Sequence, residues 1–417
     1  MEEVGKVGSA DREEDERGSD RENRGAGKKK TTMKKTKTKR SGKRKGGGKK
    51  NYWMGCLRVE SDERGNVDMT VDFPGERAEP THLVVMVNGL IGSAQNWRFA
   101  AKQLLKKYPE DLLVHCSKRN YSMLTFDGVD VMGQRLAEEV RSVIERHPSL
   151  RKISFVGHSL GGLIARYAIA CLYEQETRDE LAQNNDHPSE NIGDSHGGEG
   201  FKGRIAKLEP INFITSAAPH LGSRGHKQVP LFGGLYTLER FATRISWCLG
   251  RTGKHLFLAD KDDGKPPLLL QMVSDNEDLK FISALQCFKR CVAYANTSFD
   301  HLVGWSTSSI RRHNELPKLQ RRSVSEKYPH IVNVEPPATA INRNEDLSEA
   351  NPVGFNNFDM EEEMIRGLTK LRWERIDVNF RGSIQRFLAH NTIQVKTKCI
   401  NDAGTDVIQH MNDNFMP

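Results

Sequence analysis

A Gly-x-Ser-x-Gly motif centred on Ser159 constrains the fold of this chain more than any other stretch of its sequence. An apolar, β-branched run over residues 152–158 leads into the motif, and a helix-forming run begins at Leu160. This order predicts a strand, a sharp turn and a helix, with the serine in strained backbone angles at the turn. Side chains at Gly157 and Gly161 would collide with the turn and with a neighbouring strand, so both positions need glycine. The alternative is a glycine-rich loop with a buried serine, but the flanking strand and helix favour the turn known as a nucleophile elbow.

Further apolar runs alternate with helical periodicity along the chain. Residues 82–87 are nearly all apolar, as a central parallel strand covered on both faces should be. Other elements are expected as strands at 112–116, 211–215, 291–296 and 375–380, as a hairpin of 56–60 with 67–73, and as helices at 97–108 and 132–144. Strands and helices in alternation predict the fold class α/β, with a mostly parallel central sheet and helices on both faces.

The net charge of the chain is +8, but the first fifty residues carry all of it. Residues 1–50 hold 18 Lys and Arg against 9 Asp and Glu, a net charge of +9, which leaves −1 for the rest. They show no apolar periodicity, so we expect this tail to be disordered. Its basic half, residues 28–50, fits a nuclear signal, a nucleic-acid contact, an anchor to anionic membrane or a merely solvated tail. Nothing in the sequence argues for a specific nucleic-acid partner.

Residues 51–417 are expected to form one domain with insertions at about 174–203, 225–275 and 306–370. Residues 229–258, within the second insertion, are rich in Leu, Phe, Trp and Ile and carry few charges. They follow a strand end on the same edge of the sheet as the serine, so we expect a lid over the substrate entrance. The alternative is permanent burial against the domain, the commoner fate of apolar helix faces.

The seven cysteines are scattered, and Cys287 with Cys291 fits a helix followed by a strand better than a metal-ligand pair. No apolar run is long enough to span a membrane, and no signal peptide follows Met1. These features predict a soluble cytoplasmic protein with reduced thiols.

A serine is a weak nucleophile at neutral pH unless a base takes its proton and an acid orients the base. Asp300 lies four residues beyond the strand that ends at Asn296, and His390 lies on the loop after the last strand. We therefore expect Asp300 as the acid and His390 as the base, in the chain order Ser, Asp, His. His410 is the alternative base, although it lies inside a helical run. Weaker candidates follow no strand, precede the acid or abut it: Asp275, Asp278, His220 and His301.

Two backbone N–H groups are expected to bind a developing oxyanion. Leu160 begins the helix after the serine, and Leu90 lies in the glycine-rich loop after residues 82–87. Gly89 would let that loop approach a substrate closely; the alternative is an ordinary tight turn. Residues expected to contact the substrate are Gly89, His158, Pro219 and His220.

Seven blocks of the sequence resemble the serine esterase family of plant lipase-like proteins. This family is part of the α/β hydrolases and is similar to fungal monoacylglycerol and phospholipid lipases. The resemblance covers roughly residues 52–415 apart from two polar insertions, in blocks at 82–97, 126–132, 153–167, 213–228, 255–257 with 265–269, 294–312 and 387–395. It implies the α/β hydrolase fold, Ser159 as nucleophile, Asp300 as acid, His390 as base, and Leu90 with Leu160 as the oxyanion hole.

The sequence departs from this pattern in two places. Many lipases have His-Gly where this chain has Asn88-Gly89, but the donor there is a backbone group, so we expect little effect. The charged tail is not part of the family pattern.

A serine carboxylic-ester hydrolase acting on acyl lipids through an acyl-enzyme is the function that the sequence predicts. It implies no cofactor and no metal. The expected partners are a lipid or ester substrate and, peripherally, a membrane or lipid-droplet surface. The alternatives are an esterase for small soluble esters and a hydrolase-fold protein that binds a ligand without turnover. The complete set of candidate residues argues against the last.

Overall fold

A computed structural model describes residues 56–61, 67–72, 79–175, 203–223, 249–261, 264–318, 325–337 and 357–417. The chain divides into residues 1–52 and residues 53–417, and all of the described residues belong to the second unit. The basic tail therefore lies outside the described residues, as do residues 224–248 of the segment expected to form a lid.

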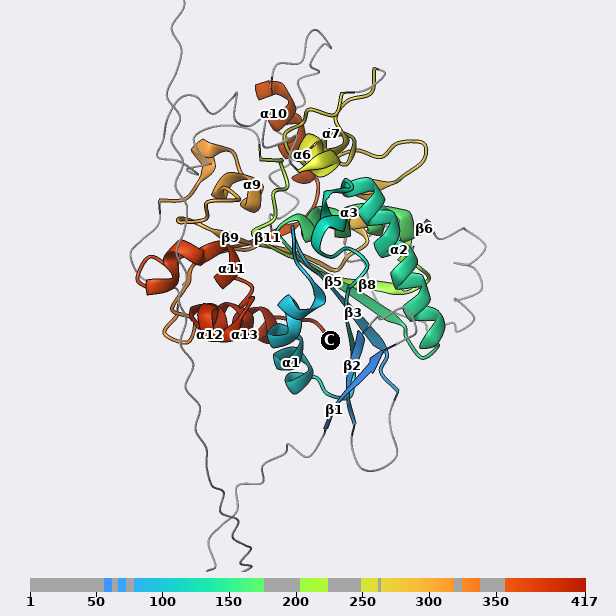
Figure 1. Cartoon of the computed structure of the whole chain (residues 1–417). Helices are drawn as coiled ribbons and strands as arrows, with labels where there is room; N and C mark the ends of the chain where they lie inside the picture. Colours follow the sequence, from blue (N-terminus) through green and yellow to red (C-terminus); the bar gives the residue numbers. More distant parts are fainter. Residues whose placement is uncertain are drawn as a thin grey trace, which may run out of the picture. The chain divides into compact units, whose positions relative to one another are not determined.

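A nine-stranded sheet runs through the described residues in the order β1-β2-β4-β3-β5-β8-β9-β11-β10 (Figure 1). From β4 to β11 neighbouring strands are parallel, whereas β1, β2 and β10 at the two edges pair antiparallel. The strand bounds are β1 Cys56–Ser61, β2 Val67–Asp72, β3 His82–Val87, β4 Leu112–Cys116, β5 Lys152–His158, β8 Glu209–Ser216, β9 Arg290–Asn296, β10 Ile331–Glu335 and β11 Trp373–Val378. A separate pair is formed by β6 Tyr173–Gln175 and β7 Gly203–Ile205.

Helices cover both faces of this sheet. One face packs against α2 Val129–Arg146, α3 Leu160–Leu172 and α8 Phe281–Gln286. The other packs against α1 Arg98–Lys107 and α13 Thr405–Asp413. The other α-helices are α6 Gly250–Leu256, α7 Leu268–Gln271, α9 Trp305–Ser309, α10 Asn357–Leu368, α11 Ala389–Thr392 and α12 Lys398–Asn401. The 3-10 helices are η1 Ala94–Trp97, η2 Ser122–Phe126, η3 His313–Glu315, η5 Ile384–Leu388 and η6 Asp402–Gly404.

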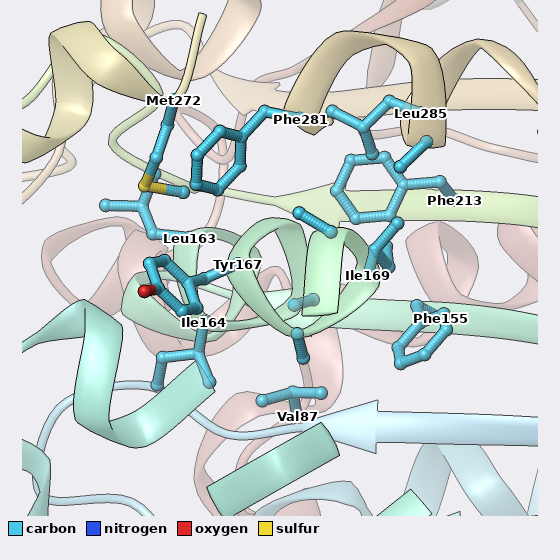
Figure 2. Close-up of a cluster of buried hydrophobic side chains, with 14 of the residues drawn as sticks. Val87, Phe155, Leu163, Ile164, Tyr167, Ile169, Phe213, Met272, Phe281 and Leu285 are labelled. Carbon is cyan, nitrogen blue, oxygen red and sulfur yellow. The ribbon is translucent and has the colours of Figure 1, made fainter. Parts of the chain in front are cut away.

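The apolar run of β3 supplies both cores because successive side chains of a strand point to opposite faces. Leu83, Val85 and Val87 belong to the core under α2 and α3, whereas Val84 and Met86 belong to the core under α1 and α13. Figure 2 shows α3 within the first core, with Val87 on one side of it and side chains of α8 on the other. The expected central strand and its two covered faces are confirmed, and they place α3, with the serine at its start, in the middle of the domain.

The predicted strands and the N-terminal hairpin are all present, with bounds that differ by a few residues. The region expected as a third insertion, residues 306–370, holds elements that were not predicted. Strand β10 pairs with β11 at the sheet edge, and α10 buries Met364 and Leu368 in the core. Strand β10 has only five residues, Ile-Val-Asn-Val-Glu, and such a short edge strand gives too little pattern to separate it from a loop.

Helix α6, in the part of the second insertion that the structure describes, is hydrogen-bonded to the rest of the domain. In α6, the hydroxyl of Thr252 accepts a hydrogen bond from the N–H of Gly128 (3.0 Å), and His255 Nδ1 accepts one from Val129 (3.0 Å). Leu256 is buried in the core. The lid prediction stays a prediction, because its most apolar part lies outside the described residues.

The last residues of the chain lie at the amino ends of the parallel strands. The amide of Asn212 near the start of β8 donates to the carbonyl of Met416 (2.8 Å), and Lys152 at the start of β5 donates to that of Pro417 (3.2 Å). The opposite edge, where β5 and β9 end, is the edge that carries the site.

Candidate active site

Ser159 lies at the sharp turn between β5 and α3, in backbone angles that favour glycine, with φ 54° and ψ −130°. The glycines around it make this turn possible. A Cβ at Gly157 would lie 2.7 Å from the N atom of Gly162, and one at Gly161 would overlap the carbonyl of Val87 in β3. The strain at a non-glycine residue is retained because packing on all sides determines the turn. The predicted elbow and the predicted reason for its glycines are confirmed.

The loop after β3 lies directly against Ser159. A Cβ at Gly89 would come within 2.8 Å of the Cβ of Ser159, so only glycine lets the two backbones approach this closely. The buried Asn88 side chain fixes the loop by donating to the carbonyls of Gly89 (3.2 Å) and Asn120 (2.8 Å). The Asn88 side chain therefore stabilises the conformation of this loop.

The hydroxyl of Ser159 lies 2.9 Å from Nε2 of His390, although 231 residues separate the two in sequence. The other ring nitrogen of His390, Nδ1, lies 3.0 and 3.1 Å from the two carboxylate oxygens of Asp300. The structure thus brings the three predicted side chains into one hydrogen-bonded line, with the histidine in the middle. All three are largely buried.

The buried carboxylate of Asp300 accepts hydrogen bonds from four donors. Its Oδ1 accepts from the N–H groups of Leu302 (3.0 Å) and Val303 (2.9 Å), its Oδ2 accepts from Asn296 (2.8 Å), and His390 supplies the fourth. Burial alone would raise the pKa of Asp300, but the charge and hydrogen bond of His390 and these donors lower it below its ordinary value. The carboxylate is therefore ionised at neutral pH and favours a proton on Nδ1 of His390.

His390 lies in the short helix α11, directly after η5, rather than on a loop as the sequence predicted. Its backbone is held by His158, the residue before Ser159. Nε2 of His158 donates to the carbonyl oxygen of His390 at 2.7 Å, and the two rings lie 4.8 Å apart. Burial and the nearby charge of His390 lower the pKa of His158 to about 3, so His158 stays neutral beside it. This bond joins the serine turn to the histidine helix.

Two of the four residues expected to contact the substrate are engaged within the protein instead. His158 is buried against His390, and the fully buried His220 lies 3.0 Å from the hydroxyl of Thr215 and packs edge-on against Trp373. Burial places the pKa of His220 well below its usual range. Both rings have partners within the protein, and a substrate role for Gly89, His158, Pro219 and His220 stays a prediction.

The alternative base His410 and the alternative acid Asp275 have hydrogen-bond partners away from Ser159. Nδ1 of His410 in α13 lies 2.9 Å from the hydroxyl of Tyr294, inside the core on the other side of the sheet. Asp275 was expected to be a solvated charge, but its Oδ1 accepts from the N–H groups of Ile282 (2.9 Å) and Ser283 (3.1 Å) at the start of α8. It caps a helix and lies outside the site.

The two predicted oxyanion donors flank the serine. Leu160 is the first residue of α3, where an N–H has no carbonyl to bond within its own helix. Leu90 follows Gly89, and the structure records no acceptor for its N–H among the described residues. Beyond it, Ile91 has φ 51° and donates to the hydroxyl of Thr125 (3.0 Å), which holds the loop open at Leu90.

A buried polar network that was not predicted supports the Asp300 loop. Trp305, at the start of α9, donates from Nε1 to Asp377 of β11 (2.7 Å), and Arg311 forms an ion pair with the same carboxylate (2.9 Å). Nothing in the local sequence connects these residues, because 66 positions separate Arg311 from Asp377. Asn296 could have been found, since it ends the strand four residues before the acid.

Within the described residues there is no group of three or more His, Cys, Asp or Glu side chains that could hold a metal ion. Cys116, Cys171, Cys287, Cys291 and Cys399 are free thiols. Among the helices that the structure describes, none combines the length and the apolar character needed to cross a bilayer.

The strand order, the serine at a strand–helix turn and the order Ser, Asp, His along the chain define the α/β hydrolase fold. A family model described as "Putative serine esterase (DUF676)" matches residues 77–310, more than half of the chain. The chain therefore belongs to this serine esterase family.

Two curated relatives come from fungi. "Putative lipase ROG1" of Saccharomyces cerevisiae is 32% identical over 264 residues, which cover 60% of this chain and 32% of the yeast protein. "Putative lipase C4A8.10" of Schizosaccharomyces pombe is 25% identical over 284 residues, covering 65% of this chain and 31% of that one. The chain thus spans about a third of the length of these relatives. Carboxyl esterase 2 of Tuber melanosporum aligns over 88% of both chains at 12% identity, with a TM-score of 0.38, a value that adds nothing to the fold assignment.

Proposed function

We propose that this chain is a serine carboxylic-ester hydrolase acting on acyl lipids. The observation that carries the proposal is the continuous contact from Ser159 through His390 to Asp300 at the strained turn. A structural serine has no need of strained backbone, a histidine on its hydroxyl and a buried acid behind the histidine. Membership of a serine esterase family supports the ester bond as the one cleaved.

In the proposed reaction, Ser159 attacks the ester carbonyl carbon while His390 Nε2 takes the hydroxyl proton. Asp300 stabilises the imidazolium that results, and the N–H groups of Leu90 and Leu160 bind the negative oxygen of the tetrahedral intermediate. His390 then gives its proton to the leaving alcohol, which leaves an acyl-enzyme. Water, deprotonated by His390, attacks the acyl carbon and releases the carboxylic acid and the free serine.

The acyl-lipid part of the proposal draws on the two yeast relatives, whose names describe them as lipases. It predicts that long-chain acylglycerols or phospholipids are cleaved with higher kcat/KM than short, water-soluble esters. The opposite preference would make the chain an esterase of small esters and leave the proposed chemistry intact.

Labelling with a fluorophosphonate probe tests the chemistry directly, because the probe reacts with a serine only where a base activates it. Wild-type protein should be labelled, and Ser159→Ala should not. Ser306→Ala is a matched control, since that buried serine lies in α9 away from the histidine. Well-folded wild-type protein that takes no label would overturn the proposal in favour of ligand binding without turnover.

A further inference from the structure

The 3-10 helix η5, directly before His390, presents large apolar side chains to solvent. Ile384 is 98% exposed, Phe387 58% and Leu388 42%. Because a 3-10 helix has three residues per turn, Ile384 and Phe387 lie on the same face of η5. A side chain as exposed as Ile384 has no protein wall around it, so it protrudes and lines no pocket.

Polar contacts hold η5 in this orientation. Between the exposed residues, Gln385 donates to the carboxylate of Asp402 and accepts from the N–H of Ala403 (3.0 Å), both in η6. Its own N–H donates to the N-cap hydroxyl of Ser383 (3.0 Å). The amide faces the protein and the apolar side chains face outward, the reverse of what burial of apolar area would select in water.

The chain around η5 is cationic. Residues 381–398 contain no Asp or Glu, and they contain Arg381, Arg386, Lys396 and Lys398. None of these four is in an ion pair with a carboxylate among the described residues. The guanidinium of Arg386 lies over the ring of Phe387, 4.8 Å from its centroid. Asp402 contacts η5 through its carboxylate, which accepts a hydrogen bond from Gln385.

This surface adjoins the proposed catalytic residues. Leu388 is two residues from His390, and Phe387 packs edge-on against Phe299, the neighbour of Asp300, with ring centroids 5.6 Å apart. Figure 1 shows α11, which holds His390, next to α12, which packs against η5. A surface that contacts η5 would therefore lie close to His390 and Asp300.

We propose that Ile384 and Phe387, with Arg381 and Lys398 in the same cationic stretch of the chain, dock the protein onto an anionic phospholipid surface. Protruding aliphatic and aromatic side chains enter the headgroup region of a bilayer without needing a matching cavity, and neighbouring cations gain from anionic lipids. A protein partner would need a shaped apolar pocket for each protruding side chain, with acidic residues beside the pockets to pair with the cations. The docking itself does not rest on the proposed function. Only the idea that docking delivers substrate to Ser159 rests on it.

Co-sedimentation of the full chain with vesicles tests the docking. The vesicles are phosphatidylcholine with or without phosphatidylserine, measured at low salt and at ~0.5 M salt, where the charges of residues 1–50 are screened. We expect Ile384→Ser/Phe387→Ser to weaken binding to phosphatidylserine vesicles at least ~10-fold at the higher salt, since two apolar contacts are lost. Met416 is 40% exposed and lies at the opposite edge of the sheet. The control variant Met416→Ser should therefore bind the vesicles as the wild type does.

A second pair of variants tests the cations. Arg381→Gln/Lys398→Gln should weaken binding at low salt several-fold, whereas Lys370→Gln/Arg372→Gln removes the same charge before β11 and should change little. All four variants should hydrolyse a short soluble ester as the wild type does, which shows that the site is folded. Absence of turnover in every form would contradict the proposed function and leave the vesicle result standing.

Three results would overturn the docking proposal. One is wild-type protein that does not bind phosphatidylserine vesicles. Another is an Ile384→Ser/Phe387→Ser variant that binds them as tightly as Met416→Ser. The third is a wild-type dimer in gel filtration that this double variant abolishes without any change in vesicle binding, because η5 would then contact a second copy of the chain.

Discussion

His115 and His390 are both buried histidines that contact carboxylates, yet only His390 has a ring nitrogen that faces a hydroxyl group. His115 in β4 has Asp68 on Nδ1 and Glu139 on Nε2, the latter at 3.0 Å. Burial would lower the pKa of His115, but the two carboxylates outweigh it and raise the pKa to about 9. His390 has a carboxylate on Nδ1 alone, and its Nε2 faces the hydroxyl of Ser159.

The comparison shows that the partner of the second ring nitrogen decides what a buried histidine does. With two carboxylates, His115 is held as a cation that ties β4 to α2 and β2. With one carboxylate and one hydroxyl, His390 has a nitrogen that can take a proton and return it. Burial and a nearby acid, which the two share, do not separate a structural histidine from a base.

The largest effect expected from breaking the comparison is at His390. His390→Ala should lower kcat for ester hydrolysis by roughly 10⁴-fold or more, because the proposed nucleophile Ser159 would lose its proposed base. The double variant with Ser159→Ala should be no worse than either single variant, since the groups act as a unit. His410→Ala, whose ring contacts Tyr294, is the control and should change kcat little. Steady-state kinetics in which His410→Ala is the damaging change would make His410 the base.

At His115 the expected effect is on stability. His115→Gln leaves Asp68 and Glu139 buried without the cation between them, so we expect a loss of about 3–5 kcal/mol in the free energy of unfolding. Urea denaturation measures this loss. The kcat of the folded fraction should stay at the wild-type value, in contrast to His390→Ala. A fall in kcat per folded molecule would contradict a purely structural role.

An intermediate effect is expected at His158, which positions His390 through its carbonyl oxygen. His158→Leu removes the donor, so the ring of His390 should shift and kcat should fall by up to about 10²-fold with little change in KM. His158→Gln keeps an N–H in reach of the carbonyl and should recover much of the loss. If the two variants had equal kcat and equal melting temperatures, the hydrogen bond would have no positioning role.

The smallest effect expected is a pH dependence of stability with a maximum near pH 6.5. His115 binds a proton more tightly when folded, so its contribution is complete below its unfolded pKa of about 6.5 and is lost as the pH rises to about 9. Burial lowers the pKa values of His82 and His158 to about 3, so unfolding takes up protons below pH 6.5 and stability falls there too. Melting temperatures across this range should lose the alkaline decline, and keep the acidic one, in His115→Gln.

The sequence by itself determined the central strand β3 and the sharp turn at Ser159. The apolar run of β3 has to be covered on both faces, and Gly157 and Gly161 permit a turn that any side chain there would block. Both features depend on neighbours within a few residues, or on a strand that apolar content alone identifies. The order of Ser159, Asp300 and His390 after successive strands then followed from the parallel sheet, because parallel strands end at one edge.

Only the tertiary structure decided which histidine faces the serine and what holds it there. His390 and His410 are 20 residues apart, and which of them reaches Ser159 depends on how α11 and α13 pack. The bonds of His158 to His390, Trp305 to Asp377 and His115 to Asp68 join residues from 47 to 232 positions apart. No periodicity or spacing encodes such pairs. They form because folding removes polar groups from water, and each must then find a partner within hydrogen-bond distance.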